Sequence, residues 1–378
     1  MAPLFSEGKV MELVDEAKEI GPNLFASVMG TGIIANAAVT LPIFGEELQP
    51  FALIVWLLAT VLLVFLSVLK ILQMVMRPDV VQRQLNDPVM AQFFGAPPMA
   101  LLTISGGFIL IGKTVIAPWL AIEIAWWLWV VGTVLGLATA VSIPYRLFTR
   151  YKVKDDAAFG GWLMPVVPPM VSAAVGALLI PYLGDAESKR LLMYLCYSLF
   201  GISFMAAFII ITMIWSRLAH AGTSGGARVP TLWIVLGPLG QSITAMGALG
   251  LVASQVVSAE KAALLDGMSS VFGVPVWGFA MFWFVLASLL TLKALKLKMP
   301  FSLTWWSFTF PVGTCVTGTT QLALHTNMMF FDIAAVVLFS LLILAWVIAT
   351  IGTLKGIYQG HILRPATGAP DVISRKDH

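Results

Sequence analysis

The sequence predicts an all-α integral membrane protein with ten transmembrane helices, arranged as five helical hairpins in a quasi-fivefold bundle. Composition, the number of apolar segments and a repeat of helix-breaking residues predict this fold. The 378-residue chain is 59% hydrophobic and 11% charged, with a mean hydropathy of +0.92. In soluble domains about a quarter of the residues are charged. The chain therefore belongs in a lipid bilayer, and nothing in it indicates a nucleic-acid partner.

Ten apolar segments have the length of a membrane crossing, because a helix needs about 20 residues to span the hydrocarbon core. Short connections join them into one transport domain, 22–356, between a cytoplasmic N-terminal segment, 1–21, and a cytoplasmic tail, 357–378. Residues 7–20 are typical of an amphipathic surface helix. The predicted crossings are 22–41, 50–75, 94–113, 118–145, 160–183, 190–216, 229–257, 271–293, 301–325 and 329–354.

Helix breakers recur in alternate segments. The pairs are Gly30/Gly32, Pro97/Pro98, Pro168/Pro169, Pro238/Gly240 and Pro311/Gly313. Measured from Gly30 through Pro98, Pro169 and Pro238 to Pro311, the intervals are 68, 71, 69 and 73 residues. A repeat of this length is long enough for two membrane crossings. Backbone groups freed inside a bilayer are tolerated only where protein or a water-filled cavity satisfies them. We therefore expect the five odd-numbered helices to surround one central pore.

Odd and even helices also differ in composition. In one 20-residue window per helix, Gly, Pro, Ser and Thr make up 41 of 100 residues in the odd helices and 17 of 100 in the even ones. Small residues allow close helix approach, whereas long aliphatic runs suit lipid. This contrast predicts an inner ring of odd helices and an outer ring of even ones. Tight packing in a solid bundle would also explain the small residues, although not the recurring breakers.

Charge placement predicts the orientation. One side of the predicted topology carries 18 Lys and Arg residues and the other carries four. The positive-inside rule then places both termini on the cytoplasmic side. The predicted location is the cell (inner) membrane. No odd-helix interior contains Asp, Glu, Lys or Arg. Exposed N–H groups at helix breaks favour small anions as the cargo, although freed carbonyls next to the same breaks would suit a cation.

Phe310 is the candidate gate. It directly precedes Pro311, and a phenyl ring at the level of the breaks would close a narrow pore by steric block and dewetting. Packing between helices is the alternative role for this ring. Gln241 is the one amide inside a breaker helix, where it either lines the path or bridges two helices. The candidate pore-lining residues are Gly30, Thr31, Pro98, Pro169, Pro238, Gln241, Pro311, Gly313 and Thr314.

Few residues could carry other chemistry. His325 and Glu123 are the candidates for proton coupling, but both lie near the predicted external ends, where a helix cap or a vestibule contact also explains them. Cys196 and Cys315 fall in apolar segments and are expected to pack without a metal or disulfide role. An intramembrane enzyme would need paired acids or a nucleophile and base at mid-membrane depth. No such set is visible, and no cofactor or metal site is expected.

Five stretches resemble the tellurite-resistance/dicarboxylate transporter family, which includes slow anion channels, malate permeases and sulfite efflux pumps. They are SVMGTGIIA (27–35), NDPVMAQFFGAPPMALL (86–102), MPVVPPMVSAA (164–174), RVPTLWIVLGPLGQS (228–242) and FTFPVG (308–313). The resemblance implies five hairpins around a pore, a homotrimer with one pathway in each protomer, and a gate at Phe310. It implies transport of a C4-dicarboxylate such as malate, or of sulfite. A passive gated channel for inorganic anions is the alternative, and an intramembrane enzyme a distant one.

Overall fold

The computed structural model describes residues 20–223 and 226–359, and all regular elements in these ranges are helical. The predicted surface helix at 7–20 lies outside them, apart from Ile20, as does most of the predicted tail. A short helix, α4 (Pro78–Asn86), follows α3. The longer helices, in chain order, are α2 (Phe25–Thr40), α3 (Gln49–Met76), α5 (Ala96–Leu110), α6 (Pro118–Thr149), α7 (Pro168–Leu179), α8 (Ala186–Ala221), α9 (Leu236–Val252), α10 (Ala259–Lys296), α11 (Phe310–Thr326) and α12 (Met329–Tyr358).

Within the described residues, eight helical segments are long and apolar enough to cross a membrane. The chain is therefore a multi-pass membrane protein. The other two predicted crossings correspond to shorter elements. α7 and the 3₁₀ turn after it form an apolar segment, Pro168–Tyr182, and α11 has 17 residues, several of them threonines.

Burial separates the long helices into two kinds. In the most apolar window of the segments containing α2, α5 and α9, 78%, 72% and 89% of the residues are buried inside the protein. In α3, α6, α8, α10 and α12 the share is 22–33%. The helices rich in small residues are thus the inner ones, and the aliphatic helices present side chains such as Ile54, Phe208 and Val271 to the outside.

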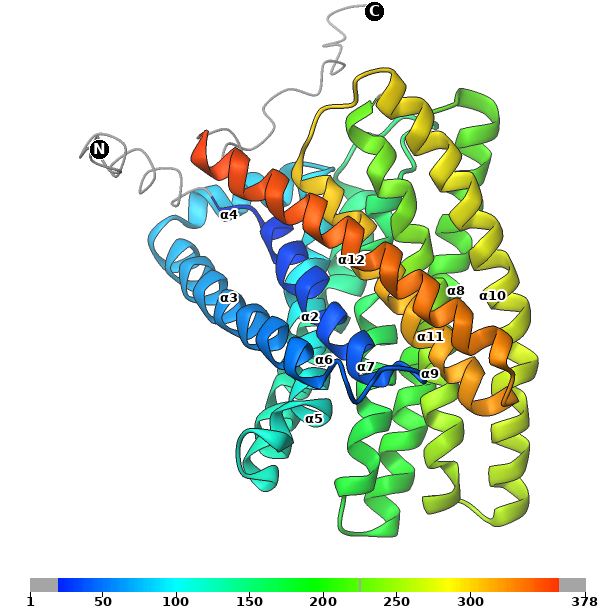
Figure 1. Ribbon diagram of the computed structural model, residues 1–378. Coiled ribbons are helices and arrows are strands. Elements are labelled where there is room, and N and C mark those ends of the chain that lie inside the picture. The colour runs from blue at the N-terminus through cyan, green and yellow to red at the C-terminus, as the bar shows by residue number, and fades with distance from the viewer. Residues whose placement is uncertain (1–19, 224–225, 360–378) are drawn as a thin grey trace, which may run out of the picture.

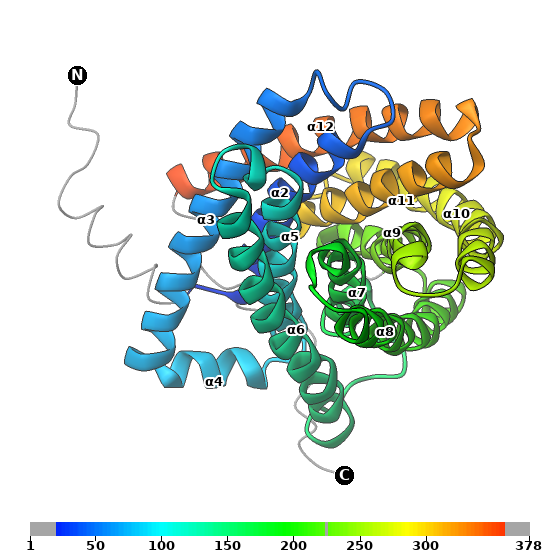
Figure 2. The same ribbon diagram turned by 90° about the horizontal axis from the view of Figure 1, so that it is seen from below.

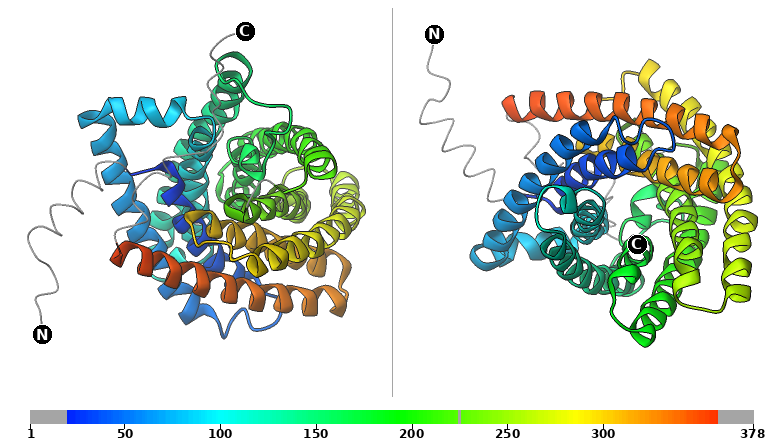
Figure 3. Two further views of the ribbon diagram at one scale, coloured as in Figure 1. Left: turned by 90° about the horizontal axis from the view of Figure 1, so that it is seen from above. Right: turned by 60° about the horizontal axis from the view of Figure 1, so that its bottom comes forward.

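The inner helices form a closed cycle of contacts. α2 packs against α5, α5 against α7, α7 against α9, α9 against α11, and α11 against α2. Each is followed in the chain by an outer helix that packs against it, as the view along the bundle shows (Figure 2). α12 also crosses α2 on the outside, and α2 begins at the end of the bundle where α12 finishes (Figure 1). The same succession of inner and outer helices is visible from the opposite end (Figure 3).

Each inner helix begins after a 3₁₀ segment. These segments are η1 (Pro22–Leu24), η2 (Met90–Gly95), η4 (Gly160–Leu163), η6 (Gly226–Val235) and η8 (Leu303–Phe308). Pro97, Pro168 and Pro311 occupy the first turn of α5, α7 and α11, where the missing N–H has no intrahelical partner to lose. The prolines therefore start α-helices instead of breaking them midway. In the first repeat the expected break is absent, since α2 runs unbroken through Gly30 and Gly32.

Glycines at the contacts of α11 allow the close approach that the cycle needs. A Cβ on Gly240 would lie 2.5 Å from the backbone nitrogen of Cys315, and a Cβ on Gly313 would lie 2.6 Å from Cγ1 of Ile33. Hydroxyls cross the same contacts, as where Thr244 and Thr317 are 2.8 Å apart between α9 and α11. Lipid provides no hydrophobic force between helices, so such close packing holds them together.

Tryptophans of the outer helices are hydrogen-bonded to the inner elements. The indole N–H groups of Trp129, Trp283 and Trp346 donate to the Ser172 carbonyl, the Leu232 carbonyl and the Thr31 hydroxyl, at 2.8, 2.9 and 3.1 Å. Hydrogen bonds of this kind contribute about 0.6 kcal/mol each on average in membrane proteins. They also fix the rotation of α6, α10 and α12 relative to the inner elements that accept these hydrogen bonds.

The α9–α11 contact should not tolerate even one added methyl group. We expect Gly240→Ala to destabilise the detergent-solubilised protein by about 1–3 kcal/mol, because the new Cβ would overlap the α11 backbone. Gly278→Ala on α10 is the matched control, since nothing lies within 4 Å of the added atom; it should be neutral, or stabilising by up to about 1 kcal/mol. Thermal unfolding measures both, and equal melting temperatures would contradict the packing argument.

Candidate functional site

A cavity lies where the inner helices begin. It encloses about 450 Å³ of empty space, part of which is open to solvent. All five repeats contribute to its wall, which is formed by Ala26, Met29, Phe93, Met99, Met164, Val167, Ile234, Gly237, Pro238, Leu303, Trp306, Ser307, Phe310 and Pro311. The wall is almost wholly apolar and contains no ionisable side chain.

The residue beside the breaker lines the cavity in every repeat. Met29 precedes Gly30, Met99 follows Pro98, Val167 precedes Pro168, Gly237 precedes Pro238, and Phe310 precedes Pro311. Sequence reasoning identified Phe310 in this way but missed Met29, Met99 and Val167. The position directly before the breaker would have identified Met29, whereas Met99 follows its breaker and Val167 precedes Pro169 by two residues.

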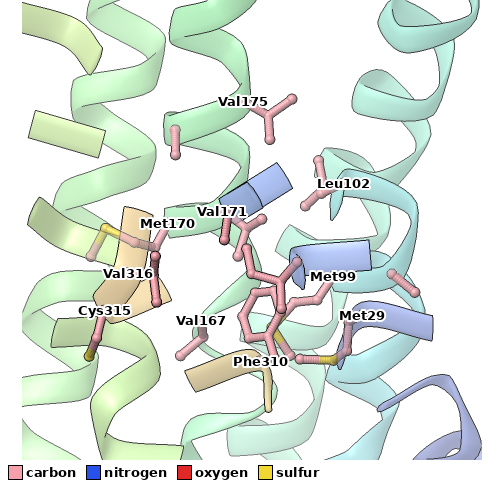
Figure 4. Packing of buried hydrophobic residues seen from close by; sticks show 14 of the residues in the cluster. Met29, Met99, Leu102, Val167, Met170, Val171, Val175, Phe310, Cys315 and Val316 are labelled. Carbon is pink, nitrogen blue, oxygen red and sulfur yellow. The ribbon is translucent and has the colours of Figure 1, made fainter. Parts of the chain in front are cut away.

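Phe310 is a buried residue in the wall of this cavity. It is the first residue of α11 and is 3% exposed. Its ring lies among Met29 of α2, Met99 of α5 and Val171 of α7 (Figure 4). One turn further along α7, Val175 lies beyond the ring (Figure 4). The side chain of Phe310 therefore fills the space between three of the inner helices.

The first turn of an inner helix, or its cap, reaches the cavity in four of the repeats. Met99 and Pro238 are in the first turn of α5 and α9, Val167 caps α7, and Phe310 begins α11. The N-terminal end of a helix carries a positive partial charge of roughly half an elementary charge. The positive potential at the cavity therefore comes from backbone dipoles, and a side-chain hydroxyl is supplied by Ser307.

Of the other predicted lining residues, Pro238 and Pro311 lie in the cavity wall, whereas four lie at contacts between helices. A Cβ on Gly30 would meet the Thr309 hydroxyl at 2.2 Å. Thr31 accepts the indole hydrogen of Trp346. Gly313 is packed on Ile33, and the Thr314 hydroxyl of α11 is 3.2 Å from the Gly237 carbonyl of α9. Pro98 and Pro169 are buried outside the cavity wall.

Gln241 combines burial with an amide that has no partner. It is 4% exposed, and within the described residues its Oε1 has no hydrogen-bond partner. On α9 it follows Pro238 by three residues and Ile234 by seven, so it lies on the face of α9 that lines the cavity, one turn further in. Buried polar side chains are nearly always hydrogen-bonded. An unpartnered amide at this depth therefore requires an explanation.

His325 joins three helices at the opposite end of the bundle from the cavity. Its Nε2 is 3.0 Å from the Gly247 carbonyl of α9, and its Nδ1 is 2.8 Å from Oδ1 of Asp266 on α10. A carbonyl only accepts, so Nε2 carries a hydrogen, and the contact with Asp266 requires a further proton on the ring or the carboxyl. Glu123 instead accepts from Trp127 at 2.8 Å on an exposed face of α6. The two predicted coupling candidates are therefore not brought together.

Within the described residues, the side chains form neither a metal site nor a reactive thiol. Among the described residues there is no group of three or more His, Cys, Asp and Glu side chains that could hold a metal ion. Cys196 and Cys315 are buried free thiols. The Cys315 thiol points to the Leu236 carbonyl at 3.7 Å, which places it at the α9–α11 contact.

Known proteins resemble this chain over most of its length. Residues 19–354 match the SLAC1 family, described as voltage-dependent anion channels. A sulfite efflux pump of Trichophyton rubrum is 29% identical over 82% of this chain and 84% of its own. An uncharacterized transporter of Methanocaldococcus jannaschii is 26% identical over 93% and 97%. A malic acid transport protein of Schizosaccharomyces pombe is 20% identical over 59% and 54%.

The match extends from the start of the first inner helix almost to the end of the last outer helix, and so includes all five repeats and the cavity they form. It is consistent with the apolar composition, the multi-pass helices and the uncharged cavity wall. The chain therefore belongs to the SLAC1 family of anion transport proteins.

Proposed function

We propose that this protein moves small anions across a cell membrane through a conduit along the axis of α2, α5, α7, α9 and α11, with Phe310 as its gate. One observation carries the proposal. The cavity takes wall residues from all five repeats, and one of them is the buried phenyl ring of Phe310. Such a ring blocks a pore both sterically and by excluding water. In this reading ten crossings form five hairpins, and each hairpin contributes one wall of the conduit.

An anion fits this cavity better than a cation does. Helix N-termini supply positive partial charge at the wall, and the acidic rings typical of cation pores are missing from it. The wall also has no Lys or Arg to neutralise a second negative charge. The free-energy cost of desolvating an ion rises steeply with its charge, and the helix dipoles at the wall offset only part of that cost. A singly charged anion is therefore the substrate that the wall favours.

Hydrogensulfite meets this requirement, and the named relatives that align over most of this chain are sulfite efflux pumps. We propose export of sulfite as the first function. A C4-dicarboxylate such as malate is the second candidate, supported by the partial alignment to a malic acid transport protein. A passive channel for inorganic anions is the third, supported by the description of the family.

The orientation and assembly are also proposals. The excess of Lys and Arg on one side supports termini in the cytoplasm and residence in the inner membrane. A homotrimer is proposed from the family resemblance alone. Light scattering of the purified protein, corrected for bound detergent, would distinguish a trimer from a monomer.

Removing the ring of Phe310 should open the conduit. In proteoliposomes we expect Phe310→Ala to raise sulfite flux by about tenfold or more, because the mutation removes both the steric block and the dewetted constriction. Phe308→Ala is the control, since Phe308 packs on Trp233 and Trp305 outside the cavity wall. Unchanged flux in Phe310→Ala, in protein that remains folded, would show that Phe310 is a packing residue.

The same vesicles separate a carrier from a channel. A panel of sulfite, malate, nitrate and chloride is tested at two pH values, with planar-bilayer current recorded in parallel. Saturable, pH-dependent flux without measurable current supports the carrier, whereas sustained current that rises in Phe310→Ala supports the channel. If no anion of the panel moves, the transport proposal is wrong.

The Gln241 amide should donate to the passing anion. We expect Gln241→Leu to lower sulfite flux by about tenfold, the loss of one hydrogen bond to a charged group, and Gln241→Glu to abolish it by like-charge repulsion. Gln82→Glu on exposed α4 is the control for an added charge elsewhere. Normal flux in Gln241→Glu would remove Gln241 from the pathway.

His325 should stabilise the bundle without coupling protons to transport, because both ring nitrogens already face fixed partners. We expect His325→Gln to lower the melting temperature while leaving the ratio of sulfite fluxes at pH 5.5 and 7.5 unchanged. Glu123→Gln should change neither quantity. A pH ratio that collapses in His325→Gln alone would instead identify His325 as the coupling group.

A further inference from the structure

Near the end of α8 lies a buried arginine that has no partner among the described residues. Arg217 is 6% exposed, and its Nε has no hydrogen-bond partner. Within the described ranges, the guanidinium forms neither an ion pair nor a hydrogen bond. Burying a charge is costly unless it is paired and hydrogen-bonded, and the groups that break this rule need an explanation. An absent anion would explain it.

A second arginine, Arg228, acts electrostatically on Arg217. Arg228 lies in η6, with its guanidinium carbon 5.5 Å from the centre of the Phe159 ring. Arg228 and Asp156 are the charged groups whose fields act on Arg217. Asp156 is exposed and forms no ion pair with either arginine in the described part of the chain. Within the described residues, neither arginine is therefore paired with a carboxylate.

The segment η6, which carries Arg228, is packed against η4, and η4 is packed against α8, which carries Arg217. Phe159 is buried with Ala158 and Trp162. The backbone of η4 is so close to η6 that a Cβ on Gly160 would overlap the Thr231 carbonyl, and the Thr231 hydroxyl donates to the Arg228 carbonyl at 2.6 Å. The arrangement is therefore preorganised, so that binding an anion here would not require a loop to be ordered first.

We propose that Arg217 and Arg228 bind a small oxyanion at the end of the bundle where the cavity opens. Planar guanidinium groups match the oxygen geometry of phosphate, sulfite and carboxylate. η4 leads directly to Met164 and η6 contains Ile234, both of which lie in the cavity wall. The occupant is either a free anion or the phosphate of a lipid headgroup. The site does not depend on the gate or on transport.

Binding is measured on the full-length protein in detergent, with inorganic phosphate and sulfite as probes and sodium chloride at equal ionic strength as the reference. We expect either oxyanion to raise the melting temperature of the wild type by about 2–4 °C at concentrations well above its dissociation constant. Arg217→Gln and Arg228→Gln should lose this shift. Arg150→Gln, an exposed arginine at the end of α6, should keep it.

Native mass spectrometry supplies the second arm, because it detects phospholipid that remains bound. A bound phospholipid that is lost in Arg217→Gln and Arg228→Gln but kept in Arg150→Gln would support the site and identify its occupant as a headgroup. A shift with free oxyanions would identify a soluble occupant. If Arg217→Gln does not fold, the result for Arg228→Gln alone decides whether the anion site exists. Wild-type behaviour of Arg228→Gln in both arms would overturn the proposal, whatever the flux measurements show.

Discussion

Close approach between the inner helices is the constraint on which the rest of this structure depends. Lipid does not drive apolar helices together, so the ring must be held by contacts between surfaces that fit. Gly240 and Gly313 bring α11 against α9 and α2 with no room for another atom. The hydroxyls of Thr244 and Thr317 find partners across the contact. Larger residues at the glycine positions would separate the helices and widen the space that Phe310 now fills.

That constraint also explains the character of the cavity. Backbone groups at the start of a helix have no intrahelical partner, and each of the five inner helices begins after a 3₁₀ segment in a repeat that contributes residues to the cavity wall. Proline in the first turn of α5, α7 and α11 removes donors that would otherwise remain unpaired. What remains is an apolar wall with a weak positive potential. Such a wall suits a small anion that passes through without binding tightly.

Charge is kept away from this axis and placed at the two ends of the bundle. At the end opposite the cavity, His325 and Asp266 join α9, α10 and α11. At the cavity end, Arg228 lies on η6, which contributes Ile234 to the wall, and Arg217 lies on α8, which packs against η4. In the proposed conduit, a charge midway along the path would bind a counter-ion too strongly for it to leave, because conduction requires sites that are weak enough to release the ion.

Much of the fold could be predicted from residues alone. Apolar length located the helices to within a few residues at most ends, because the bilayer imposes a minimum span, and small-residue content separated buried α9 from exposed α10. Prediction was poorer where propensity and packing compete. Pro168 and Pro311 were expected to break helices, but they lie in the first turn of α7 and α11. Gly30 was also expected to break a helix, but it lies inside unbroken α2, where its missing side chain leaves room for Thr309. Residues 259–270 extend α10 well beyond the predicted crossing, since packing there continues past the lipid-spanning length.

The sequence by itself determined that this chain lies in a membrane, which helices are buried, and that Phe310 directly precedes the helix breaker of the fifth repeat. These properties depend on composition and spacing, which are local. Only the tertiary structure decided which way each side chain points around its helix. Thr31 and Thr314 have the residue types of a pore lining but lie at contacts between helices, whereas apolar Met29 and Met99 line the cavity. The rotation of a helix about its axis is set by the neighbours on every side, and those neighbours come from distant parts of the chain.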